Sequence, residues 1–160
     1  MLEFDPEIVL MDCSAQCREE VINDLVNKME VAGYVTSAYT DNVLSRENRY
    51  PTGLPTEGVR VAIPHGMNAE GILRQGIGIA KLTKPVTFCN MADANEELDV
   101  ELVFLLANRE AEAQLHDLRA LMECFSEAEL LCQLKETNTA EEFILLLQEA
   151  CAANDCFCED

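Results

Sequence analysis

Apolar residues recur every three or four positions in the first part of the chain, which is the spacing of an amphipathic helix. The pattern predicts a helix over residues 14–29, with Ser14 as its N-cap and Gly33 as its stop. The apolar face of this helix consists of Cys17, Val21, Ile22, Leu25, Val26 and Met29. A second helix is predicted to begin at Ser37 and to run toward Arg46, which then lies near its C-terminal end.

The chain changes character after Arg46. Two prolines and two glycines fall within residues 47–58, and such a segment neither continues a helix nor forms a central strand, so we expect a structured loop. Alternating apolar residues over positions 59–63 then predict a short strand that ends at Pro64 and His65.

Three further apolar segments are typical of strands. Alternation over residues 76–82 predicts the first, and a short apolar piece at residues 86–88 predicts the second. The continuous apolar run at residues 102–107 predicts a strand that is covered on both faces. The acidic segment 93–101 has no calcium-loop pattern, so we expect a solvated face there.

The last part of the chain is helical in pattern. From Glu112 onward, one apolar stripe consists of Leu115, Leu118, Leu121, Met122 and Phe125. Two capping boxes, Ser126 with Glu129 and Thr139 with Glu142, then predict the starts of two more helices.

The order of these elements indicates an α/β protein. Helices, then several strands, then helices are expected to form a three-layer α/β/α sandwich with a mixed β-sheet. No internal repeat or long linker divides the sequence, so we expect one domain over residues 1–151 and a frayed tail over residues 152–160. A chain of 160 residues is long enough to bury one hydrophobic core.

Composition and charge narrow the function classes. No apolar stretch approaches the roughly 18 residues of a membrane span, and the acidic start is unlike a signal peptide, so a cytoplasmic location is expected. The formal net charge of −19 disfavours binding to nucleic acid or anionic lipid and favours basic partner proteins. The eight cysteines show no metal-ligand spacing, and we predict neither a metal nor another cofactor.

His65 is the candidate for chemistry. The segment Val61-Ala-Ile-Pro-His65-Gly66 ends a strand with a rigid proline, and the glycine is expected to let another molecule approach the imidazole closely. In sheets that are covered on both faces, ligands bind at the ends of the strands. From position alone, a histidine that merely finishes a strand is the simpler interpretation.

A longer motif changes that interpretation. Arg46-Glu-Asn-Arg-Tyr-Pro-Thr-Gly precedes Val-Ala-Ile-Pro-His65-Gly66 after a short spacer, and the apolar strand at Leu102 and the helix start at Gln114 follow. Over about residues 5–150 this pattern resembles the type 2 enzyme IIA domains of sugar phosphotransferase systems, the mannitol and fructose class. The arginine-to-histidine spacing and the Tyr-Pro-Thr-Gly segment are closest to the galactitol-type branch.

The resemblance implies a phosphoryl carrier. His65 is expected to accept a phosphoryl group from the phosphohistidine of a small basic carrier protein and to pass it to a cysteine of enzyme IIB, which works with a membrane enzyme IIC. An imidazole suits this role because its neutral form is available near pH 7. The expected sugar is galactitol or a related polyol. A regulatory domain of the same fold is the alternative, whereas a hydrolase lacks a nucleophile motif.

The resemblance also assigns residues around the phosphoryl group. Arg46 matches the functional arginine of the family, and a guanidinium binds phosphate oxygens in a bidentate manner. A favourable interaction with the helix dipole is the alternative for Arg46, and Arg49 or Arg60 can take its place at the phosphate. Thr52 either donates its hydroxyl to phosphate or stabilises the turn.

The second histidine of the mannitol and fructose types is absent from its usual place. Gln114 occupies that position, as in the galactitol-type branch, and its amide can bond the imidazole or a phosphoryl oxygen without adding charge. An exposed glutamine at a helix start is the alternative. His116 lies two residues later, about 200° around a helix, so it is predicted to be a surface histidine that faces away from anything Gln114 faces.

Overall fold

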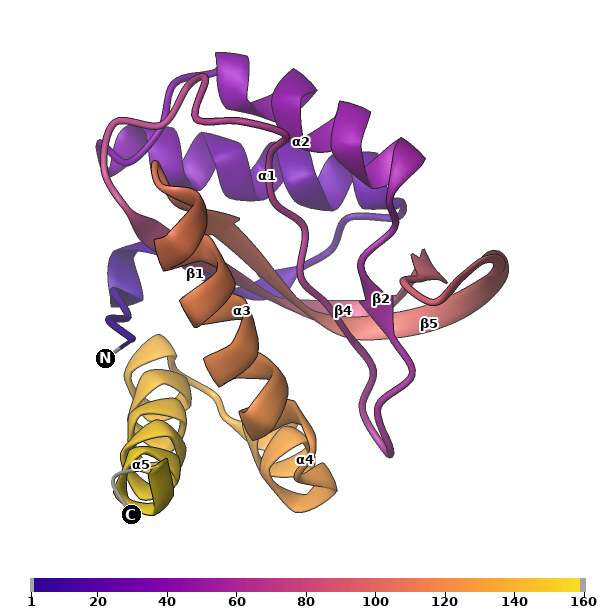
Figure 1. The fold of residues 1–160 in the computed structure, drawn as a ribbon. Coiled ribbons are helices and arrows are strands. Elements are labelled where there is room, and N and C mark those ends of the chain that lie inside the picture. The colour runs from indigo at the N-terminus through magenta and orange to yellow at the C-terminus, as the bar shows by residue number, and fades with distance from the viewer. Residues whose placement is uncertain (1, 159–160) are drawn as a thin grey trace.

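A β-sheet lies between two layers of helices (Figure 1). The computed structural model describes residues 2–158, and of residues 154–158 the backbone alone. Two helices, α1 (Arg18–Val31) and α2 (Ala38–Arg49), cover one face of the sheet. The other face is covered by α3 (Ala111–Phe125), α4 (Ala128–Glu136) and α5 (Ala140–Cys158). The predicted three-layer α/β/α sandwich is therefore confirmed.

The sheet is mixed, as predicted. Within the described residues its strands are β1 (Val9–Cys13), β2 (Gly53–Leu54), β3 (Val61–Ala62), β4 (Gly76–Asn90) and β5 (Asp93–Ala107), and a 3-10 turn, η1 (Pro6–Ile8), precedes β1. Strand β4 pairs parallel with β1 and antiparallel with β5. Strand β3 pairs parallel with β5 and antiparallel with β2, so β3 lies beside Leu102 and Val103 in the second half of β5.

Each face of the sheet carries its own hydrophobic core, because successive side chains of a strand point to opposite faces. In β5, Val103 and Leu105 pack with α1 and α2, whereas Phe104 and Leu106 pack with α3, α4 and α5. Both sets are fully buried. This is why the sequence of the strand reads as an uninterrupted apolar run.

The first helix begins later than predicted. Its N-cap is Cys17 and not Ser14. The sequence analysis also missed β1, which ends directly before Ser14. Only the two ends of β1, Val9 and Cys13, are buried, so its sequence shows no alternation. The stop at Gly33 is confirmed by a φ of 85°, which favours glycine.

The segment after Arg46 is less irregular than predicted. Helix α2 continues to Arg49, and β2 forms within the proposed loop at residues 47–58. The strands predicted at residues 76–82 and 86–88 are one strand, β4, with a register shift between them. The acidic segment 93–101 is the first half of β5, and its carboxylates at positions 93, 96, 97 and 99 are exposed, as expected for a solvated face.

The helix starts in the last part of the chain were predicted with mixed success. The Thr139 hydroxyl accepts the N–H of Glu142 at 3.1 Å, which confirms that cap. Ser126 does not cap α4, because its hydroxyl donates to the Glu123 carbonyl at 2.6 Å and Glu127 is the N-cap. Two residues of the predicted apolar stripe of α3 are exposed, Leu115 and Met122.

The C-terminal segment continues the last helix. Helix α5 runs to Cys158, so the tail expected at residues 152–160 falls partly on this helix and partly on residues 159–160, which lie outside the described residues. The domain boundary at residue 151 stays a prediction. Across residues 2–158, no helix combines the length and the apolar character that a bilayer crossing requires.

Candidate functional site

His65 lies just beyond β3, beside the end of β5. Its backbone forms a parallel bridge with Leu106, whose N–H donates to the Pro64 carbonyl at 3.0 Å. The residue is only 4% exposed. The histidine is therefore held on a rigid part of the sheet, at the strand end where the sequence placed it.

The hydrogen bond of the imidazole fixes its tautomer. Nδ1 of His65 lies 2.9 Å from the Ile63 carbonyl oxygen. Because a carbonyl oxygen only accepts, Nδ1 carries the proton and Nε2 keeps its lone pair. Within the described residues Nε2 has no hydrogen-bond partner. Nε2 is consequently the atom that is free to act as a nucleophile.

Burial keeps this imidazole neutral. Desolvation lowers the pKa of His65 to about 4, the Ile63 hydrogen bond partly opposes the shift, and the positive charge of Arg46 adds to it. At pH 7 the ring is therefore uncharged. Of the predicted site residues, Arg46 is the one whose charge lowers the pKa of His65.

Arg46 lies in the last turn of α2 with its side chain half-buried. Its Nη1 donates to the Tyr50 carbonyl at 3.2 Å, and the guanidinium lies over the Tyr50 ring, 5.5 Å from the centroid. Among the described residues Arg46 forms no direct ion pair with a carboxylate. Most of its donors are thus available to an anion.

Thr52 is fully buried and bonded to another side chain. Its hydroxyl donates to Oε2 of Glu47 at 2.8 Å, and its backbone N–H donates to Oε1 at 3.0 Å. Burial raises the pKa of Glu47, although the two bonds from Thr52 favour its charged form. These contacts favour the turn-stabilising interpretation of Thr52, and its role as a phosphate ligand stays a prediction.

Sequence reasoning missed the residues that hold the His65 segment from α2. The Tyr39 hydroxyl accepts the Gly66 N–H at 3.0 Å, and Asn42 Oδ1 accepts the Met67 N–H at 2.8 Å. A Cβ on Gly66 would lie 2.8 Å from both side chains. The expectation that Gly66 leaves room for another molecule was wrong, because α2 fills that space.

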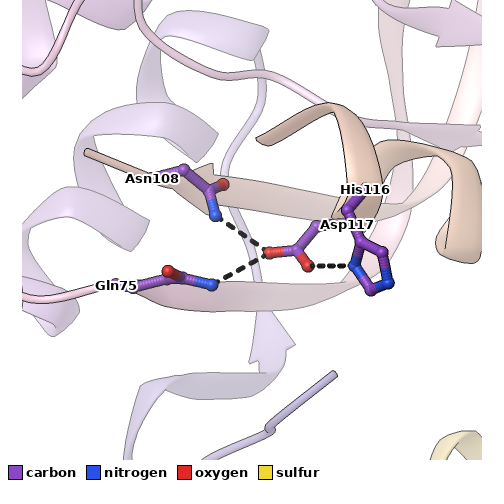
Figure 2. A network of polar contacts seen from close by, with 4 residues as sticks. All are labelled: Gln75, Asn108, His116 and Asp117. Carbon is purple, nitrogen blue, oxygen red and sulfur yellow. Dashed lines mark hydrogen bonds and ion pairs between the residues drawn. The ribbon is translucent and has the colours of Figure 1, made fainter. Parts of the chain in front are cut away.

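Helix α3 begins four residues after the end of β5, the strand whose Leu106 is the bridge partner of His65. Gln114 lies in its first turn and is half-buried, and within the described residues its side chain makes no hydrogen bond. His116, two residues later, has a side chain that is 64% exposed, which confirms a surface histidine. Its Nδ1 lies 3.3 Å from Oδ1 of Asp117 (Figure 2).

Asp117 ties α3 to the ends of two strands. Its Oδ2 accepts from Nδ2 of Asn108 at 2.9 Å and from Nε2 of Gln75 at 3.3 Å (Figure 2). Asn108 follows β5 and Gln75 precedes β4. This buried carboxylate fixes the second turn of α3, which follows the turn that contains Gln114. Among residues 2–158, no group of three or more histidine, cysteine or acidic side chains is placed to hold a metal ion.

Residues 3–150 match the sequence profile of the family described as phosphoenolpyruvate-dependent sugar phosphotransferase system, EIIA 2. The chain belongs to this family. It is therefore an EIIA component that acts as a phosphotransferase, and the resemblance noted in the sequence is confirmed.

Relatives of this EIIA 2 domain include a component of a phosphotransferase system and a transcriptional regulator. The galactitol-specific EIIA component of Escherichia coli K12 is 31% identical over 129 residues, which cover 79% of this chain and 85% of the relative. The transcriptional regulator ManR of Bacillus subtilis 168 is 32% identical over 136 residues, which cover 83% of this chain but 19% of the relative.

A solved structure shows the same fold. The complex of mannitol enzyme IIA with phosphorylated enzyme IIB from Escherichia coli matches with a TM-score of 0.78 and 22% identity, over 93% of this chain and 99% of the other.

The EIIA 2 domain brings together only some of the predicted site residues. The positive charge of Arg46 acts on the His65 imidazole. Thr52 and Gln114 form no side-chain hydrogen bond with either of them within the described residues. Arg60 lies before β3, at the other end of that strand from His65, and Arg49 follows Arg46 in the last turn of α2.

Proposed function

We propose that this chain is the phosphoryl carrier of a sugar phosphotransferase system, with His65 as the residue that becomes phosphorylated. One observation carries the proposal. The His65 imidazole is neutral and buried, its Nδ1 proton is held by the Ile63 carbonyl, and its Nε2 lone pair is unoccupied beside the positive charge of Arg46. This is the state that a histidine nucleophile requires.

The transfer follows from this geometry. Nε2 of His65 attacks the phosphorus of a phosphohistidine on the donor protein, and the P–N bond of the donor breaks as the new P–N bond forms. The electron pair of the broken bond returns to the donor imidazole. The Nδ1 proton stays on the His65 ring in its hydrogen bond to the Ile63 carbonyl, so the phosphorylated ring carries a positive charge. The donor leaves as a neutral imidazole because its other ring nitrogen holds a proton. The second transfer reverses these roles, with a cysteine thiolate of enzyme IIB attacking phosphorus and Nε2 leaving.

Arg46 supplies the positive charge that the transfer needs. Three oxygens of the phosphoryl group carry negative charge during an in-line displacement, and fixed donors aimed at them stabilise the transition state. The guanidinium of Arg46 stays protonated and has free donors. Gln114, at the start of α3, is proposed to orient the imidazole or a phosphoryl oxygen, and it adds no charge.

The partners are proposed from charge and from the solved complex. A net charge of −19 favours encounter with a small basic phosphocarrier protein. The mannitol IIA of similar fold was solved with phosphorylated enzyme IIB, which supports an enzyme IIB as acceptor here. Since phosphoenolpyruvate is a cytoplasmic metabolite, we also propose a cytoplasmic location.

The sugar system is proposed to be that of galactitol or a related polyol. The galactitol-specific relative supports it, as do the Tyr-Pro-Thr-Gly segment and Gln114. A regulatory role is the second candidate, and the match to part of ManR favours it. The two functions share the chemistry of His65 and differ in the protein that receives the phosphoryl group.

Phosphorylation from phosphoenolpyruvate tests the proposal. Wild type, His65→Ala and His116→Ala are incubated with labelled phosphoenolpyruvate, enzyme I and the phosphocarrier. We expect an acid-labile label on wild type and His116→Ala and none on His65→Ala. An unlabelled wild type contradicts the proposal. A chase with galactitol enzyme IIB then removes the label if the chain serves transport, and leaves it in place if the role is regulatory.

A further inference from the structure

Three polar side chains lie on one face of α2. Tyr39, Asn42 and Arg46 are separated by three and four positions, which places them in one row along a helix. Two of them bond the segment that carries His65, and the third acts electrostatically on its ring. We propose that Tyr39 and Asn42 are positioning residues that hold His65 in its transfer geometry, which rests on the proposed function of His65.

Tyr39 connects the backbone on both sides of His65. Its buried hydroxyl accepts the Gly66 N–H at 3.0 Å and donates to the Leu106 carbonyl at 2.6 Å. Gly66 is the next residue in the chain, and Leu106 is the bridge partner of His65. A single oxygen atom therefore links the residue after the imidazole to the residue opposite it. Burial raises the pKa of Tyr39 to about 12, so the hydroxyl keeps the proton that it donates.

Asn42 holds the turn that follows. Its Oδ1 accepts the Met67 N–H at 2.8 Å, and its Nδ2 donates to the carbonyls of Asn68 and Glu70, both at 3.0 Å. Residues 67–70 are exposed, so little packing constrains them. The side-chain amide of Asn42 thus fixes the conformation of the exposed turn that directly follows His65.

These bonds also determine which hydrogen-bond donors are available to the phosphoryl group. The N–H groups of Gly66 and Met67 both point to α2, where Tyr39 and Asn42 accept them. They are not available as backbone donors to phosphoryl oxygens. Arg46, in the same row of the helix, has side-chain donors that these bonds leave free. One rigid helix therefore sets the nucleophile and its cation relative to each other, over about 10 Å of its length.

Removal of one oxygen atom tests the proposal. Tyr39→Phe keeps the ring in the core and leaves the Gly66 N–H and the Leu106 carbonyl without their partner. We expect single-turnover phosphorylation of His65 to slow about tenfold, with the KM for the phosphocarrier unchanged within twofold, because the docking surface is unaltered. Nitrogen NMR of the imidazole is expected to show a smaller fraction of the Nδ1–H tautomer.

Tyr34→Phe is the matched control. It deletes the same atom, but the Tyr34 hydroxyl donates to Asp5 at 2.6 Å and to no residue of the His65 segment. Its rate and its imidazole spectrum are expected to equal those of wild type. A folded Tyr39→Phe protein with the wild-type rate and the wild-type tautomer overturns the proposal.

Asn42→Ala is a second variant for the case in which Tyr39→Phe does not fold. Asn42 is only half-buried, so its replacement is expected to leave the fold intact. Faster amide exchange at residues 67–70 and a several-fold slower transfer are expected, and unchanged values for both contradict a positioning role. The NMR and exchange measurements need no phosphoryl donor. If the wild type takes no phosphoryl group, the proposed function fails while these readouts still decide whether α2 positions His65.

Discussion

The helices α2 and α3 carry residues that were predicted to act with His65, and the two helices are anchored in different ways. From α2, the Tyr39 hydroxyl and the Asn42 amide bond the backbone after His65, and Arg46 acts on the ring. From α3, Asp117 fixes the helix to the strand ends, yet within the described residues Gln114 makes no side-chain hydrogen bond and its neighbour Leu115 is 49% exposed.

The difference fits the proposed function, in which the chain meets a phosphoryl donor and a phosphoryl acceptor in turn. A nucleophile works best when its own support is rigid, because misplacement of the reacting atoms slows transfer steeply. A surface that receives first one protein and then another needs unsatisfied polar groups and exposed apolar side chains. In the proposed site, α2 is the rigid half, bonded to the backbone after His65, and the start of α3 with Gln114 is the half whose side chains make no such bonds.

Removal of the cation from the rigid half is expected to have the largest effect. Arg46→Ala should slow phosphorylation of His65 by about 10²–10³-fold, as loss of one donor to a transition-state anion does elsewhere. Arg46→Lys should recover little, because an ammonium lacks the bidentate fork. Single-turnover labelling from the phosphocarrier measures both variants.

Two arginines provide controls for that experiment. Arg60→Ala alters an exposed residue at the far end of β3, and Arg49→Ala alters an exposed residue in the same helical turn as Arg46. Both variants should remain within about threefold of wild type. A loss at Arg49 or Arg60 that equals the loss at Arg46 would mean that net positive charge, and not the position of Arg46, assists the transfer.

Acid should destabilise the fold through His65. The folded pKa of about 4 lies below the unfolded value of about 6.5, so between these values the unfolded chain binds a proton that the folded chain does not. The contribution of neutral His65 to the free energy of unfolding is fully present above pH 6.5. It is lost as the pH falls toward 4, by at most about 3 kcal/mol. Urea unfolding across this range measures the loss.

His65→Gln isolates that contribution. Glu47 has a raised pKa and works in the opposite direction, but its effect is common to both proteins and cancels in the difference. The stability gap between wild type and variant should therefore narrow as the pH falls from 6.5 to 4. A gap that stays constant over this range would show that His65 titrates normally in the folded protein.

The sequence predicted the layers and the position of His65 because both depend on local patterns. Apolar periodicity marks the helices and the covered strands, and Pro64 separates the short strand β3 from the histidine. Strand β1 was missed because only its two ends are buried, so the alternation that identifies a half-covered strand is absent.

The supports of His65 were beyond sequence reasoning for a different reason. Tyr39 and Leu106 are bonded across 67 positions, and no periodicity of either segment contains that pairing. Thr52 matched a phosphate-site motif, yet its hydroxyl bonds Glu47. The one usable signal was the spacing of Tyr39, Asn42 and Arg46, which a search for polar rows on helices would have found.

Gln114 tests whether the α3 half touches the phosphoryl group. Gln114→Ala should slow the transfer several-fold if the amide bonds the imidazole or a phosphoryl oxygen. Gln114→His should change both the transfer rate and the titration of His65, because a second imidazole can carry charge there. Gln133→Ala, an exposed glutamine of α4, is the matched control. Wild-type rates and titration in both Gln114 variants would leave Gln114 as a surface residue.

Substitution of His116 is expected to have the smallest effect on phosphoryl transfer, and it tests how firmly the start of α3 is held. Its ring is exposed, and Asp117 keeps its bonds to Asn108 and Gln75 when the ring is removed. His116→Ala should therefore phosphorylate within twofold of wild type, with an unchanged rate of transfer to enzyme IIB. A tenfold loss in the second transfer alone would place His116 on the surface that enzyme IIB contacts. A loss in both transfers would show that the ring fixes the start of α3 through Asp117, and the α3 half would then be as constrained as the α2 half.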